Sequence, residues 1–148
     1  MTALCYKRRN MEIKIHSLIE DIGENGLPEG EPEINVTTTP VTVTQKDGLT
    51  LFSYTETQDG TEIKTHLYLL EGGGVRLYRT GGIVWDVTLR EGEAAKTVYS
   101  IPPYSFDAEV LPRRVTAIKD GEKYDIRLVY SMTVGGAKKD VKMRINIR

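Results

Sequence analysis

The feature that most constrains the fold of this chain is an alternation of apolar and polar residues, which glycine turns interrupt again and again. Over residues 125–134 every second side chain is apolar, and Gly135-Gly136 separates this run from a second alternating run over 138–148. Successive side chains of a β-strand point to opposite faces, so a period of two predicts a sheet with one buried face and one exposed face. Because the pattern covers most of the chain, it indicates a sheet that closes on itself.

Turn signals divide the chain at short intervals. Asp47-Gly48, Asp59-Gly60 and Asp120-Gly121 are pairs that readily adopt the positive φ angles of type I′ hairpin turns. Gly72-Gly73-Gly74 lacks the lysine of a phosphate-binding loop and is expected to be a hairpin turn. Between the turns we expect strands near 11–20, 41–46, 49–57, 61–71, 75–80, 83–90, 95–101, 105–119, 122–134 and 138–148.

Glycine and proline also predict where the strands are interrupted. Residues 21–40 are rich in both, so we expect a long loop there, which would be a flap over a barrel mouth, part of an edge strand, or a mobile segment. Pro102-Pro103 removes two amide donors and should end a ladder. Pro112 is expected at a bulge or bend within a long strand.

Successive hairpins of this kind predict an antiparallel meander of roughly 8–10 strands. A sheet of that size tends to curl or split, and closure removes its exposed edges. We therefore expect an all-β, antiparallel up-and-down barrel. A two-sheet sandwich is the alternative, and we expect no helix.

The length of 148 residues suits one domain, which we place at residues 11–148. Residues 1–10 are expected to be a disordered leader or a non-native start, with Met11 as the natural start. Deleting residues 1–10 should then leave the melting temperature unchanged.

Composition narrows the classes of protein. Cys5 is the single cysteine, so no internal disulfide is possible, and no stretch reaches the ~20 apolar residues of a membrane helix. We therefore expect a cytoplasmic protein without membrane contact, and the sequence leaves the oligomeric state open. The net charge of −1 conceals an asymmetry, because residues 1–74 carry 6 basic and 12 acidic residues, whereas residues 75–148 carry 14 and 9. The simplest interpretation is that these charges mix around one barrel.

Several segments together resemble a known family. Residues 13–21 are similar to the first strand and acidic exit of the YwiB-like family, a group of uncharacterised bacterial proteins. Residues 77–81 resemble its arginine-plus-glycine turn, and residues 99–104 and 124–132 resemble its later strands. The resemblance covers about residues 11–148. It implies a calycin-type, lipocalin-like barrel, a class that often binds small apolar molecules, but it implies no established activity.

The chain contains few motifs that are typical of catalysis or metal binding. The chain has no zinc-protease, Cys-x-x-Cys or nucleophile-elbow motif, so we expect no catalytic residues, no metal and no cofactor. His16 and His66 both fall on the polar face of their strands. They are expected to be surface residues, unless their strands meet and form a metal or acid–base pair. The acidic run from Glu20 to Glu33 lacks calcium-loop spacing and is expected to be a solvated loop.

Arg79 is the most informative single residue, because it shares a strand face with Val75 and Leu77 and should point inward. A buried guanidinium is costly unless it is paired. It would either pair at the barrel rim with a carboxylate such as Asp86 or Glu109, or bind the carboxylate or phosphate of a ligand. Other side chains expected inside are Ile15, Leu67, Leu77, Ile83, Trp85, Val87, Tyr99, Phe106, Leu128, Tyr130, Met132, Met143 and Ile145.

These observations lead to a hypothesis and two alternatives. The hypothesis is a non-catalytic module that binds a small apolar or anionic ligand through Arg79, Trp85, Tyr99, Tyr130 and Met143. The first alternative is a protein- or nucleic-acid-interaction module that uses the basic last strand. The basic residues of this strand are Lys138, Lys139, Lys142, Arg144 and Arg148. Nucleic acid is disfavoured as a partner because the strand lacks aromatic residues for stacking. The second alternative is an enzyme with a polar site inside the barrel.

Overall fold

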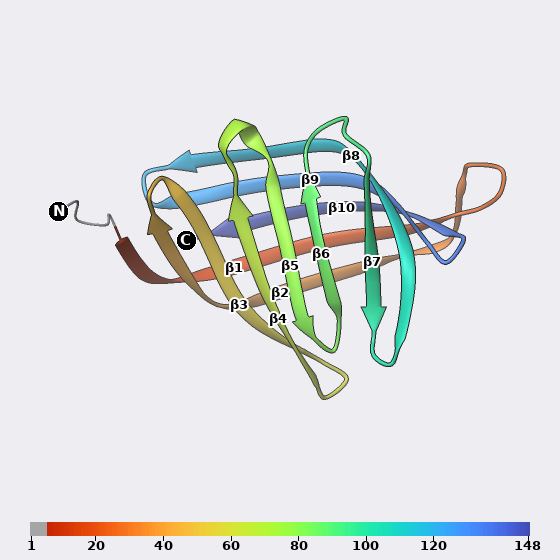
Figure 1. Ribbon diagram of the computed structural model, residues 1–148, viewed down its shortest axis with the longest axis horizontal. Coiled ribbons are helices and arrows are strands. Elements are labelled where there is room, and N and C mark those ends of the chain that lie inside the picture. The colour runs from red at the N-terminus through yellow and green to blue at the C-terminus, as the bar shows by residue number, and fades with distance from the viewer. Residues whose placement is uncertain (1–5) are drawn as a thin grey trace.

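Ten antiparallel strands close into a barrel in the computed structural model, which describes residues 6–148 (Figure 1). Each strand pairs with its neighbours along the chain, and β1 also pairs with β10, so the predicted up-and-down barrel is confirmed. The strands are β1 (Tyr6–Ile22), β2 (Pro28–Lys46), β3 (Leu49–Gln58), β4 (Thr61–Leu69), β5 (Val75–Gly81), β6 (Val84–Leu89), β7 (Ala95–Ile101), β8 (Tyr104–Asp120), β9 (Lys123–Val134) and β10 (Ala137–Ile147).

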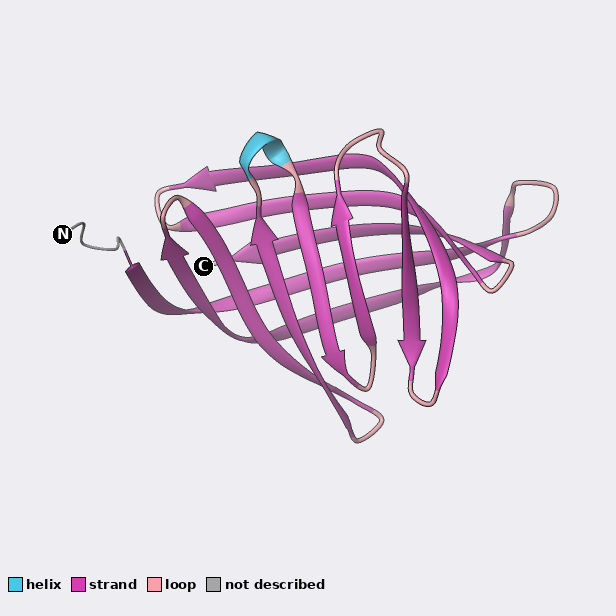
Figure 2. Cartoon of the chain, viewed as in Figure 1, coloured by secondary structure: helices cyan, strands magenta, loops and turns pink. Residues whose placement is uncertain are grey.

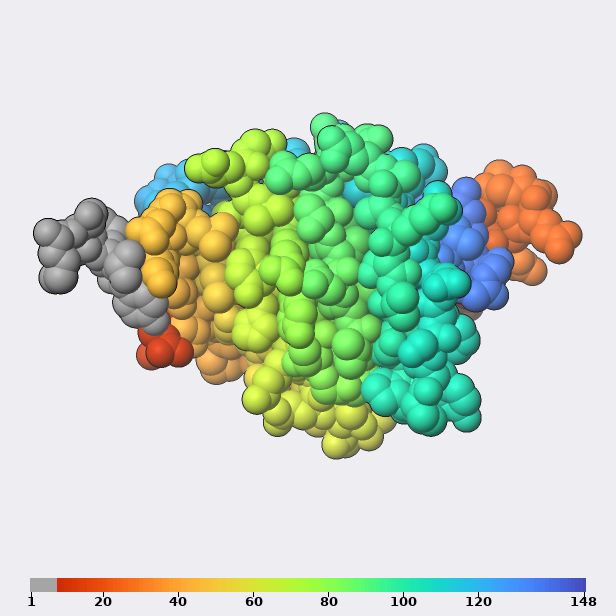
Figure 3. All heavy atoms as spheres, in the orientation of Figure 1, coloured from red at the N-terminus to blue at the C-terminus, as the bar shows by residue number. Residues whose placement is uncertain are grey.

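The barrel has two sides of different make-up. The long strands β1, β2, β8, β9 and β10 run along one side, and the shorter strands β3–β7 cross them steeply on the other (Figures 1 and 2). Figure 3 shows the side formed by β3–β7, with the turn between β1 and β2 projecting beyond the body at one end. The described residues contain no α-helix, and a single 3₁₀ turn at Glu71–Gly73 lies in the β4–β5 hairpin. No helix among residues 6–148 is long and apolar enough to span a membrane.

The turn chemistry largely agrees with the sequence. Asp47-Gly48 and Asp59-Gly60 have positive φ at both residues, as predicted for type I′ turns. The third pair is shifted by one position, because Asp120 is still the last residue of β8 and the turn is made by Gly121 and Glu122. The predicted bulge at Pro112 is present as a register shift between Pro112 and Arg114.

The predicted long loop over residues 21–40 is wrong, because only residues 23–27 lie between β1 and β2, but the alternative of an edge strand is confirmed for most of the segment. Residues 21–22 extend β1, and residues 28–40 extend β2, which pairs with β1 along most of its length. The β2–β3 ladder covers only 42–46 with 49–53 in the described structure, so the earlier part of β2 has a partner on one side alone. Pro40 is tolerated there because an edge strand does not need every amide donor, and Pro32 lies in a bulge.

The N-terminal boundary also differs from the expectation. Residues 6–10 belong to β1 and pair with residues 42–46, so a disordered leader does not extend over them. Residues 1–5, including Cys5, lie outside the described residues. Deleting residues 1–10 would remove this ladder, so we now expect it to lower the melting temperature.

The apolar face points to the barrel axis and forms one core, as the alternation predicts. Ile83 and Tyr99 are only partly buried, and Phe106 is 41% exposed, because these three lie at one end of the barrel where the interior is not filled. In residues 49–57, where apolar residues occur at both alternating sets of positions, Phe52 and Tyr54 point inward.

Candidate ligand cavity

One end of the barrel is hollow. In an up-and-down barrel all turns that lead from an odd-numbered to an even-numbered strand lie at the same end, and here a cavity of about 910 Å³ lies inside that end. Its lining includes Gln58 beside the β3–β4 turn, Ile101 beside the β7–β8 turn and Gly135 in the β9–β10 turn. Residues of β2 and β3 also line it where these two strands no longer pair.

All five residues predicted to bind a ligand line this cavity. Arg79, Trp85, Tyr99, Tyr130 and Met143 come from β5, β6, β7, β9 and β10 in turn. The closed barrel brings together side chains that are up to 64 positions apart in the chain.

A single row of inward-facing residues crosses five strands, and its members on β5, β6 and β7, which are Arg79, Trp85 and Tyr99, line the cavity. The register pairs Tyr54 with Thr65, Thr65 with Arg79, Arg79 with Trp85, and Trp85 with Tyr99. Directly opposed side chains on one face of a sheet lie about 5 Å apart, so the row is continuous. It carries a charge, three aromatic rings and three hydroxyl groups side by side.

Four polar atoms of this row are buried without a hydrogen bond of good geometry in the described structure: Arg79 Nε, Trp85 Nε1, Tyr54 Oη and Thr65 Oγ1. Of these, the Tyr54 hydroxyl lies close to Thr65 and Arg79, whereas Trp85 Nε1 has no such neighbour. Trp85 is 3% exposed, Tyr54 5% and Thr65 0%. A buried polar group without a partner costs about 1–3 kcal/mol, so such a cluster inside a protein needs a reason.

Arg79 pairs with a carboxylate, as one of the two alternatives predicted, but not with either of the two that were named. Asp86 lies on the outer face, where Arg76 donates to it at 3.0 Å and 2.7 Å, and Glu109 is exposed, so the predicted pairings are wrong. The alternation explains this, because Asp86 follows the inward-facing Trp85 and therefore points outward. Arg79 instead forms a loose ion pair with Glu56, whose Oε1 lies 3.9 Å from Arg79 Nη2, beyond hydrogen-bonding distance.

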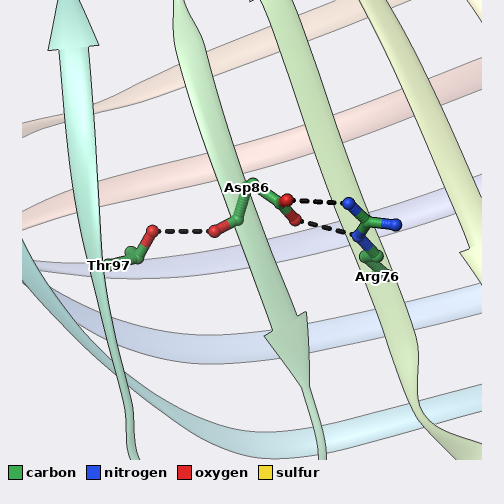
Figure 4. A network of polar contacts seen from close by, with 3 residues as sticks. All are labelled: Arg76, Asp86 and Thr97. Carbon is green, nitrogen blue, oxygen red and sulfur yellow. Dashed lines mark hydrogen bonds and ion pairs between the residues drawn. The ribbon is translucent and has the colours of Figure 1, made fainter.

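Asp86 instead links β5, β6 and β7 on the outer face of the barrel beside the cavity, through Arg76 and Thr97 (Figure 4). The β6–β7 ladder has only two pairs, Val84–Ser100 and Trp85–Tyr99. Thr97 Oγ1 donates to the Asp86 carbonyl oxygen at 2.7 Å and adds a link across this short ladder. The Arg76–Asp86 pair extends the link to β5, and this pairing lowers the pKa of Asp86.

Part of the cavity wall is aromatic. The Trp85 ring meets the Tyr99 ring edge-on at 5.6 Å and lies 6.3 Å from the Tyr130 ring. Burial raises the pKa of Tyr130 to about 12, and burial also raises the pKa of Tyr54. Both phenols are therefore neutral at physiological pH. Burial acts to lower the pKa of Arg79, but Glu56, and the neighbouring tyrosines where they are ionised, raise it overall, so the guanidinium stays charged.

Sequence reasoning missed three residues of the site: Tyr54, Glu56 and Thr65. The two faces of 49–57 could not be told apart, because apolar residues occur on both. Thr65 could have been found, because it stands between Ile63 and Leu67 at the inward positions of β4. A polar residue in the apolar register of a strand is the signal that was overlooked.

The other candidate groups are not assembled into a site. His16 lies on β1 and His66 on β4, strands that do not pair, and His66 Nδ1 lies 2.9 Å from Ser53 Oγ. Among residues 6–148 no three metal-ligating side chains cluster. The acidic run lies at the β1–β2 turn, where Lys139 pairs with Asp21 at 3.4 Å.

A second hollow of about 450 Å³ lies on the outside of the long strands. Its lining includes Arg114, Arg127, Lys142 and Arg144, which we call the basic outer face. Lys142 and Arg144 lie on the last strand, as the sequence indicated. Arg114 on β8 and Arg127 on β9 complete the basic outer face, and the sequence did not predict that they lie beside the last strand. Arg144 donates to Asp125 at 3.2 Å and 3.4 Å, so part of this charge is neutralised.

Comparison with known proteins gives a family and a fold. The DUF1934 family, described as a domain of unknown function, matches residues 13–146. The crystal structure of ywiB protein from Bacillus subtilis is similar at a TM-score of 0.78 and 20% identity, over 95% of this chain and 93% of that one. A protein of unknown function from Bacteroides ovatus gives a TM-score of 0.40 and 10% identity, over 94% of this chain and 41% of that one. No curated protein matches the chain.

Proposed function

Because the chain belongs to the DUF1934 family, as its resemblance to the YwiB-like proteins predicted, and that family has no assigned function, we propose a function from the cavity itself. The protein binds a small, partly apolar molecule inside the hollow end of the barrel and does not transform it. Small-molecule sites typically measure 300–1,000 Å³ and combine apolar walls with a few converging polar groups, and the cavity of about 910 Å³ fits this description. The single cysteine supports a cytoplasmic setting.

One observation supports the proposal above all others: the buried row from Tyr54 to Trp85 leaves polar atoms without partners. A core that only had to be stable would place apolar residues at these positions, as the opposite end of the same barrel does. Departures from local stability are expected at functional sites.

Native mass spectrometry of gently purified protein tests the proposal. We expect a retained small-molecule adduct, which denaturation should release. The intrinsic fluorescence provides a second readout, because Trp85 is the single tryptophan and lies in the cavity wall. A bare mass in repeated preparations, together with unchanged fluorescence on exposure to a cell extract of small molecules, would count decisively against a ligand.

The basic outer face supports a second candidate function, contact with a polyanion such as a nucleic-acid backbone. Four cations from three adjacent strands surround one shallow hollow. A double variant, Lys142→Glu with Arg144→Glu, should abolish retention on a polyanion such as heparin at low salt. If retention is unchanged, or if salt does not weaken it, this function is excluded.

A further inference from the structure

We propose that the cavity selects molecules that carry a carboxylate at one end and that this end enters first. The inference rests on the proposed function and deepens it by naming the chemical class that the buried row recognises. The polar atoms left without partners are not random in kind, and this is the observation from which the class follows.

The missing partner is a hydrogen-bond acceptor. Arg79 Nε and Trp85 Nε1, whose side chains line the cavity, can only donate. Tyr54 and Thr65 do not line it, and their hydroxyl groups lie close to each other and need no ligand. Arg79 and Trp85 stand directly opposite each other on β5 and β6, so their free N–H groups belong to neighbouring side chains on one wall. A ligand that brings only donors or only carbon atoms would leave all of them unsatisfied.

Charge favours a carboxylate over a neutral carbonyl group. The Arg79 side chain is 17% exposed, and its nearest anionic oxygen, on Glu56, is 3.9 Å away. A carboxylate presents two oxygens in the plane that a guanidinium prefers, and such charge-assisted hydrogen bonds are roughly twice as strong as neutral ones. Glu56 in turn disfavours a phosphate, because a doubly charged group would meet stronger repulsion from the carboxylate beside the same guanidinium.

The distribution of apolar residues sets the direction of entry. Arg79 and Trp85 lie next to the packed half of the barrel, as shown by Leu77 and Val87, their inward neighbours two positions away. Toward the open end Ile19, Ile101 and Val134 form an apolar part of the wall, and Glu33, Gln58 and Lys139 form a polar part. A ligand with its carboxylate at the base therefore places an apolar tail along apolar walls.

Three probes with one tail and different head groups test this: 4-phenylbutyrate, 4-phenylbutan-1-ol and 4-phenylbutylamine. Titration calorimetry and Trp85 fluorescence should show the carboxylate binding about tenfold more tightly than the alcohol, with the amine weakest. Equal affinity for the carboxylate and the alcohol would overturn the carboxylate inference and leave the proposed function standing. If none of the probes binds, a retained adduct in native mass spectrometry overturns the carboxylate inference alone, whereas a bare mass overturns the proposed function as well.

Matched variants identify the residues responsible. Arg79→Met and Trp85→Phe should each remove most of the preference for the carboxylate, while Arg76→Gln, on the outer face of the same strand as Arg79, should keep it. The melting temperature of the empty protein should fall only slightly in Trp85→Phe, because the smaller ring loses some packing but the indole N–H has no partner to lose. Binding to this variant is measured by calorimetry alone, because Trp85 is the single tryptophan. A preference that survives in both Arg79→Met and Trp85→Phe, or a fold that depends on them as much as on a core leucine, would show that the row is structural.

Discussion

The two ends of the barrel interior use the same strands for opposite purposes. At one end, Phe52, Leu67, Leu77, Leu89 and Ile145 are all at most 1% exposed and fill the space with apolar side chains. At the other end, the same strands continue into polar residues or stop short of filling the interior. The alternation decides which side chains point inward, but their chemistry and size decide whether the interior is packed or hollow.

Strand β5 shows the difference within three residues. Leu77 faces the packed half, and Arg79, the next inward position, faces the cavity. The residues that stabilise the fold and the residues of the proposed binding site are thus separated along the barrel axis. Substitutions in the packed half should therefore act mainly on the free energy of unfolding, and substitutions in the hollow half mainly on binding.

Truncating the packed half should have the largest effect. Leu77→Ala should reduce the free energy of unfolding by about 3–4 kcal/mol, because it leaves a void in a filled region. Met143 already borders the cavity, so Met143→Ala should reduce the free energy of unfolding by about half as much or less. Urea denaturation of both variants measures the difference, and equal losses would mean that the two halves are equally packed.

High pH should destabilise the protein through Tyr130, which lies in the hollow half. The pKa of Tyr130 is raised to about 12 in the folded protein from about 10, so the folded state holds its proton more tightly than the unfolded state. The stability is therefore intact below pH 10 and falls as the pH rises from 10 to 12, by about 2–3 kcal/mol for this group.

Urea denaturation at pH 9, 10 and 11 measures this fall. Tyr130→Phe should flatten the pH dependence, and Tyr68→Phe, on the outside of the barrel, is the control that should not. An unchanged pH profile in Tyr130→Phe would show that this phenol is not held in the neutral form.

A smaller effect is expected at the turn that closes the hollow end between β5 and β6. A Cβ atom on Gly81 would lie 2.3 Å from the Glu62 carbonyl oxygen, in a backbone with φ of +98°. Gly81→Ala should therefore cost about 2 kcal/mol. Gly60→Ala shares the positive φ but meets no atom within 4 Å, so it should cost only about 1 kcal/mol, as thermal unfolding can show.

The smallest effect is expected at the short β6–β7 ladder. Thr97→Val keeps the shape of the side chain and removes the hydrogen bond to the Asp86 carbonyl oxygen, which should cost about 1 kcal/mol. Hydrogen exchange should quicken at β6 and β7 before it changes in the packed half. Uniform acceleration across the barrel would show that this ladder does not open independently.

Much of the fold could be predicted because each hairpin carries its own information. Asp47-Gly48 sets a turn, Leu67 and Leu77 set the inward faces, and antiparallel neighbours follow one another. The extension of β2 from Pro28 could not be predicted in this way. Its prolines are permitted only because its other edge is unpaired, a fact that depends on the distant register of β3.

The candidate site was predictable residue by residue but not as a geometry. Arg79 stood out because a charge occupied an apolar register, and the same reasoning would have found Thr65. Its relation to Glu56 could not be predicted, because a spacing of 3.9 Å between atoms on β5 and β3 depends on the twist and closure of the whole barrel.

The closing ladder between β1 and β10 shapes how the chain reaches this structure. Every other ladder joins consecutive strands, whereas this one brings Ile13 opposite Ile147 and Ile19 opposite Val141. Loop-closure entropy grows with the length of chain enclosed, so the hairpins can form early and locally, while the meeting of the first and last strands bears the greatest entropic penalty. The kinetic barrier to folding therefore falls at the step that turns a curled ribbon into a closed barrel.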